Sequence, residues 1–132
     1  MYSETNEEWY NSLNTSPLTP PNYLFGIVWP ILYVMIIISG IVYFIQPQTN
    51  LFTIAISIYV LQWILNIVWS PLFFKYRQIT ASFIVITLLL VVIGINISIF
   101  GETSILSAIL LVPYFIWVLF ASYLNGYIWY NN

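Results

Sequence analysis

Two apolar stretches of this chain carry side chains suited to ligand binding by ring stacking and hydrogen bonding. Residues 62–71 read QWILNIVWSP, and residues 113–125 read PYFIWVLFASYLN. Each stretch places tryptophan, proline and a carboxamide within sequence that is otherwise hydrocarbon. Polar and amphipathic groups in lipid are costly unless paired, so they usually face other protein or a ligand. These stretches therefore indicate a buried site.

The residues that the chain lacks limit the chemistry of that site. The sequence contains no histidine, cysteine or aspartate, and its four carboxylates lie outside the apolar runs, at Glu4, Glu7, Glu8 and Glu102. A zinc site, a histidine-based triad or a carboxylate pair within the membrane therefore cannot be built. We expect no metal, no cofactor and no conventional catalytic residue, which leaves stacking and electron transfer.

Composition predicts an integral membrane protein. The 132 residues are 61% hydrophobic and 5% charged, with a mean hydropathy of +0.94, whereas soluble domains carry about 25% charged residues. The net charge is −2 and the sequence has no basic tract, so we do not expect nucleic acid as a partner.

Four apolar runs, at about 22–45, 51–74, 79–100 and 104–130, each reach the length of about 20 residues that a bilayer requires. Their short connections predict antiparallel neighbours, so residues 1–132 are expected to form one all-α, up-down membrane bundle. Both basic residues, Lys75 and Arg77, lie in the second connection. The positive-inside rule places that connection, and both ends of the chain, in the cytoplasm.

Residues 1–21 precede the first run and end in Thr19-Pro20-Pro21, which fixes an extended approach to the helix. The aromatics Trp9 and Tyr10 within otherwise polar sequence allow two interpretations: an interfacial anchor, or a lid folded over the mouth of the bundle.

Three of the four runs present aromatic faces at helical spacing. The faces are Phe25, Trp29, Leu32 or Tyr33, and Ile36 in the first run; Tyr59, Gln62, Asn66, Trp69 and Phe73 in the second; and Tyr114, Trp117, Ala121, Asn125 and Ile128 in the fourth. The third run is mainly Ile, Val and Leu, and we interpret it as scaffold.

The amides in these faces have two interpretations, because asparagine in membrane helices often hydrogen-bonds across to a neighbouring helix. We expect Asn125 to do this, and we place Asn66, between two tryptophans, in a pocket. Pro30, Pro71 and Pro113 lie inside apolar runs and can kink them. Such kinks would splay one end of the bundle around a large, flat, mostly apolar ligand.

The order and spacing of these residues resemble the TspO family, the tryptophan-rich sensory proteins also called translocator proteins or peripheral benzodiazepine receptors. The resemblance is carried by WYNSL at 9–13 followed by TPP at 19–21, by FGIVW at 25–29, by Gln62 with LN at 65–66 and WS at 69–70, and by PY at 113–114 with Trp117 and LN at 124–125. Residues 79–100 match only as a hydrophobic span.

The resemblance implies binding of porphyrins, related tetrapyrroles and similar flat apolar ligands. It assigns the pocket to Tyr10, Trp29, Tyr33, Gln62, Asn66, Phe73, Trp117 and Ala121. Trp29 and Trp117 also resemble the pair implicated in light-dependent porphyrin breakdown in some bacterial members.

The family has five membrane helices, and the resemblance here begins at the loop that follows the first. We therefore expect four helices in this chain, with one wall of the family pocket missing and a homodimer as one way to cover it. After Tyr127 the chain also lacks the basic residue of the cholesterol motif proposed for animal members, which disfavours that ligand.

Three functions follow as hypotheses. The first is a membrane receptor or carrier for tetrapyrroles, with a sensing or transport role. The second is a light-dependent porphyrin-degrading enzyme that uses Trp29 and Trp117. The third is a structural or regulatory membrane subunit whose amides serve only helix packing.

Overall fold

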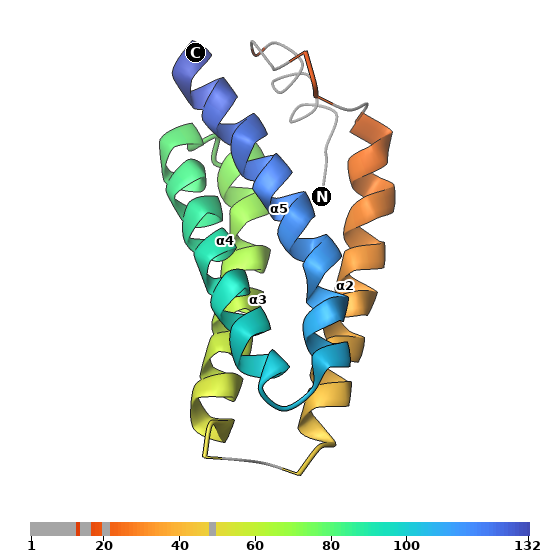
Figure 1. Cartoon of the computed structure of the whole chain (residues 1–132). Coiled ribbons are helices and arrows are strands. Elements are labelled where there is room, and N and C mark those ends of the chain that lie inside the picture. Colours follow the sequence, from red (N-terminus) through yellow and green to blue (C-terminus); the bar gives the residue numbers. More distant parts are fainter. Residues whose placement is uncertain (1–12, 14–16, 20–21, 48–49) are drawn as a thin grey trace.

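The computed structural model describes residues 13, 17–19, 22–47 and 50–132. These residues form four long helices, α2 (Asn22–Phe44), α3 (Phe52–Phe74), α4 (Ile79–Gly101) and α5 (Ile105–Asn131). All four are long and apolar enough to cross a membrane. They run alternately up and down (Figure 1), so the predicted all-α membrane bundle is confirmed. Their bounds differ from the predicted ranges by at most one residue.

Short polar connections reverse the chain between the helices. Arg77 adopts a left-handed conformation with φ of 55° in the α3–α4 turn, where the Gln78 amide donates to the Leu72 carbonyl. Ser104 caps α5, because its hydroxyl oxygen accepts a hydrogen bond from the Ser107 amide at 3.3 Å. The tight turns make α3 and α4, and α4 and α5, antiparallel neighbours.

The pairs of helices differ in how closely their backbones approach each other. α4 packs along both α3 and α5, and α2 packs mainly on α5. Aromatic side chains bridge α2 and α3, as in the contact between Tyr33 and Trp63, whose ring centroids lie 5.9 Å apart. The outer faces carry large exposed apolar side chains, which is expected where lipid replaces water.

One end of the bundle, where α2 ends and α5 begins, is tied together by hydrogen bonds and stacked rings. We call it the closed end and define it by Ser39, Gly40, Tyr43, Tyr59, Phe100 and Ser107. The Ser39 hydroxyl donates to the Ser107 carbonyl at 2.7 Å, and the Ser107 hydroxyl donates to the Ser39 carbonyl at 3.0 Å. Tyr43 stacks on Phe100 with centroids 4.1 Å apart.

The opposite end is held differently. It contains the start of α2, the α3–α4 turn and the end of α5, and the ribbons of α2 and α5 separate towards it (Figure 1). Pro30, Pro71 and Pro113 lie inside α2, α3 and α5, and each helix continues through its proline. Of the segment expected to be an anchor or a lid, residues 13 and 17–19 are described, and Leu13 packs against the hydrophobic core.

Candidate functional site

A cluster of five aromatic rings fills the space between α2, α3 and α5. We call it the aromatic box and define it by Trp29, Tyr33, Trp63, Trp69 and Trp117. Trp29 is its centre, with ring centroids 5.9 Å from Tyr33, 6.1 Å from Trp69 and 6.4 Å from Trp117. The contact with Trp117 is edge to face at 86°, a geometry that aromatic pairs favour.

Helical spacing on α2 brings two of these rings together. Trp29 and Tyr33 are four residues apart on α2, so their side chains point to the same side. Trp29 is only 5% exposed although it belongs to an outer helix of the bundle. A buried indole at the junction of three helices provides a large flat surface for stacking.

Two amides lie on the same face of α3 as the box. Gln62 and Asn66 are 0% and 2% exposed, and the amide oxygen and nitrogen of each find no hydrogen-bond partner among the described residues. Asn66 lies next to the Tyr114 hydroxyl without a well-formed hydrogen bond between them. Burial of unpaired polar groups costs free energy, so these side chains are available to a ligand or to water.

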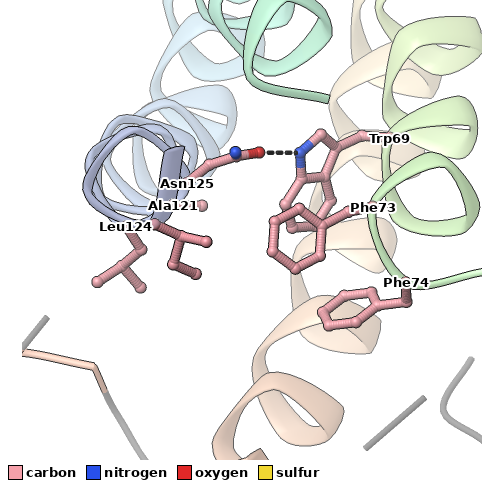
Figure 2. A pocket seen from close by; sticks show the side chains of 7 residues that line it. Trp69, Phe73, Phe74, Ala121, Leu124 and Asn125 are labelled. Atoms are coloured by element: carbon pink, nitrogen blue, oxygen red, sulfur yellow. Dashed lines mark hydrogen bonds between the residues drawn. The ribbon is translucent and has the colours of Figure 1, made fainter. Parts of the chain in front are cut away.

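Beyond Trp69 the interior contains a small hollow between α3 and α5 (Figure 2). Its lining residues are Trp69, Phe73, Phe74, Ala121, Leu124, Asn125 and Ile128. Trp69 stacks on Phe73 with centroids 5.7 Å apart. The free space is about 20 Å³, room for about one water molecule, so a large ligand must open the site.

Asn125 links helices at the edge of this hollow. Its side-chain oxygen accepts a hydrogen bond from the Trp69 indole nitrogen at 3.0 Å, as Figure 2 shows. Its side-chain nitrogen donates to the Ile79 carbonyl at 3.3 Å. One amide thus joins α5 to both α3 and α4, which confirms the packing role expected for it.

The model of the TspO/MBR family matches residues 1–130. The chain belongs to the TspO/MBR family. It is 31% identical over 125 residues to protein CrtK of Rhodobacter capsulatus, covering 94% of this chain and 78% of that protein. It is 34% identical over 119 residues to the tryptophan-rich protein TspO of Chlorobaculum tepidum, covering 89% of this chain and 75% of that protein.

The similarity extends to an animal protein. Over 128 residues the chain is 30% identical to the translocator protein of Ovis aries, covering 94% of this chain and 75% of the sheep protein. Family membership and four apolar helices together identify an integral, multi-pass membrane protein.

The structure of this TspO/MBR family member brings part of the predicted pocket together. Trp29, Tyr33 and Trp117 meet in the aromatic box, and Phe73 and Ala121 line the neighbouring hollow. Gln62 and Asn66 are buried in the core beside these rings. Tyr10 lies outside the described residues. The pocket assignment itself stays a prediction.

Two rings of the box, Trp63 and Trp69, were not in the predicted pocket. Trp69 lay on the predicted aromatic face of its helix, so its spacing was the available signal. Trp63 is on an adjoining face, and it joins the box because Tyr33 of α2 lies against it. Pairing across helices of this kind depends on how α2 and α3 cross, which spacing within one helix does not determine.

Proposed function

We propose that this protein is a membrane receptor or carrier that binds porphyrin-type tetrapyrroles and similar flat apolar molecules at the aromatic box. The observation that carries the proposal is the contact of Trp29 with one ring of its own helix and one ring each of α3 and α5. Stacking on these rings would provide affinity. The amides of Gln62 and Asn66, which make no well-formed hydrogen bond among the described residues, would orient polar groups of the ligand. The names of the relatives, as sensory and translocator proteins, agree with a sensing or transport role.

Binding requires the site to expand. Pockets for ligands of this size typically enclose about 300–1,000 Å³, far more than the 20 Å³ of free space in the hollow. We infer that the ligand displaces rings of the box and separates helices at the end away from the Ser39–Ser107 pair.

Protoporphyrin titration in detergent tests the proposal, with binding followed by porphyrin absorbance and by tryptophan fluorescence. Trp117→Ala is expected to weaken binding by about tenfold or more, the loss of about 1.4 kcal/mol from one stacking contact. Trp129→Ala is the matched control, because Trp129 is 47% exposed and stacks on Phe83 at the outer surface. Equal affinity of Trp117→Ala and the parent protein would show that the box is not the site.

A second candidate function is light-dependent porphyrin degradation. It is favoured by the edge-to-face contact of Trp29 with Trp117, because an indole in contact with an excited porphyrin is placed to exchange an electron with it. Illumination in air should then give a bilin-like absorbance that disappears in Trp29→Phe/Trp117→Phe. The same loss of porphyrin absorbance without protein would rule this activity out.

We also propose that the first residue of α2, Asn22, and the last residue of the given sequence, Asn132, both face the cytoplasm. Lys75 and Arg77 lie exposed in the α3–α4 turn, which is at the same end of the bundle as these residues (Figure 1). Labelling of single introduced cysteines from either side of sealed vesicles tests this orientation.

A further inference from the structure

A groove on the outer surface between α2 and α5 has an almost entirely apolar lining. Its volume is about 550 Å³, and its lining residues are Val28 and Leu32 of α2 with Pro113, Ile116, Trp117 and Phe120 of α5. Both helices are membrane spans, so the groove opens towards the hydrocarbon of the bilayer. Flat apolar molecules dissolved in lipid are the chemistry that this surface suits.

Trp117 lies between this groove and the other rings of the aromatic box. Its ring lines the groove and also makes the edge-to-face contact with Trp29. Phe120, one turn further along α5, packs beside it with centroids 6.0 Å apart. A rotation of the Trp117 side chain away from Trp29 would therefore join the groove to the interior.

The helices that form the groove are fastened at a distance from it. The reciprocal hydrogen bonds of Ser39 and Ser107 lie ten residues from Trp29 and from Trp117 respectively, which is about 15 Å along each helix. At the level of the groove, α2 and α5 meet through the rings of Trp29 and Trp117. Separation of the helices there need not break the serine pair.

Proline weakens both helices close to the groove. Pro30 in α2 and Pro113 in α5 have no backbone N–H, so the carbonyls of Gly26 and Ile109 lose their usual helical donors. Helices bend more readily at such positions. The two prolines thus allow α2 and α5 to move apart above a fixed closed end.

We propose that the groove is the site where the ligand first binds from the bilayer, and that it enters the aromatic box between α2 and α5 past Trp117. This inference rests on the proposed tetrapyrrole binding. It adds a surface site, a route and a gate to that function. The occupant is the same flat apolar ligand, because the groove and the box share the ring of Trp117.

Cysteine cross-linking tests the route, since the chain contains no native cysteine. Val28→Cys/Phe120→Cys places one thiol on each side of the groove, and a reversible bifunctional methanethiosulfonate reagent joins them. In lipid nanodiscs, stopped-flow quenching by protoporphyrin should show association and dissociation both slowed by about tenfold or more after cross-linking. The parent rates should return on reduction, and the equilibrium affinity should stay near that of the reduced protein.

The control is a cross-link of the same kind elsewhere on α5. Phe83 and Tyr127 line a groove of about 460 Å³ between α4 and α5, so Phe83→Cys/Tyr127→Cys is expected to leave both rates unchanged. Val28→Cys/Ile116→Cys provides a second pair across the proposed route if the first fails to fold.

The outcomes separate the route from the function. Unchanged rates in the cross-linked groove variants would overturn the route and leave the binding proposal standing. If the cross-linked groove variants lose affinity for protoporphyrin at an unchanged association rate, the route is also overturned. The groove residues would then belong to the final binding site. Failure of the parent protein to bind protoporphyrin would overturn the proposed function, and this inference with it.

Discussion

At the scale of single residues, Asn66 and Asn125 show how similar amides differ in role. Both are 2% exposed and both lie on inward faces. Asn125 bonds to Trp69 and to the Ile79 carbonyl, whereas Asn66 lies next to the Tyr114 hydroxyl and makes no well-formed hydrogen bond among the described residues. A hydrogen-bonded amide contributes to stability, and an amide without such a bond is available for binding. Substitution of Asn125 should therefore lower the free energy of unfolding, and substitution of Asn66 should lower ligand affinity.

Asn125→Leu should lower the free energy of unfolding by about 1 kcal/mol, because it removes two interhelical hydrogen bonds and leaves the Trp69 indole N–H unpaired. Unfolding in a denaturing detergent, followed by circular dichroism, measures the change. Asn131→Leu is the control, since the Asn131 side chain donates within its own helix to the Tyr127 carbonyl and is exposed. Equal losses in the two variants would contradict the linking role of Asn125.

Asn66→Leu should leave stability unchanged or raise it, since an unpaired buried amide is replaced by an apolar side chain of similar size. Protoporphyrin affinity should fall by several-fold, because a group proposed to orient the ligand is lost. The same unfolding assay measures the stability, and a porphyrin titration measures the affinity. A change in stability or oligomeric state with intact porphyrin binding would instead favour the structural-subunit hypothesis.

At the scale of helices, the contact between α2 and α3 at the closed end depends on one glycine. The Tyr59 ring lies across Gly40, and its hydroxyl donates to the Ile36 carbonyl at 2.9 Å. A Cβ at position 40 would collide with the Tyr59 hydroxyl and Cζ. The absence of a side chain there lets the tyrosine bridge two helices.

Gly40→Ala should therefore destabilise the protein by about 1–3 kcal/mol, because the tyrosine ring must leave its position. Gly26→Ala is the control: a Cβ there meets no atom of the described residues within 4 Å, and alanine favours helix by up to about 1 kcal/mol. The two variants should shift the detergent-unfolding midpoint in opposite directions. A neutral Gly40→Ala would show that the ring can move aside at little cost.

Helix positions could be predicted from sequence, whereas the contacts between helices could not. A run of about 20 apolar residues between short polar turns has few alternatives in a bilayer, so α2 to α5 begin and end close to the predicted residues. Trp63 and the groove between α2 and α5 depend on crossing geometry, which no single helix encodes. Asn96 is fully buried and has no hydrogen-bond partner among the described residues, although it lies on the helix interpreted as scaffold.

At the scale of the whole molecule, the bundle combines a fastened end with an end held by aromatic packing. The serine pair and the Tyr43–Phe100 stack fix one end. At the other, the rings of the aromatic box fill the space that a ligand would occupy. Entry of a ligand should therefore move the two ends by different amounts.

Spin-label distances can measure that difference. Ile27 of α2 and Leu119 of α5 are exposed at the level of the box, and Ile41 and Ile105 are exposed near the closed end of the same two helices. With cysteine-attached labels in lipid, protoporphyrin should lengthen or broaden the Ile27–Leu119 distance distribution and leave the Ile41–Ile105 distribution unchanged. Equal changes at both ends would mean that α2 moves as a rigid rod and that the serine pair does not act as a hinge. No change at either end, with porphyrin bound, would mean that side-chain rotation alone makes room for the ligand.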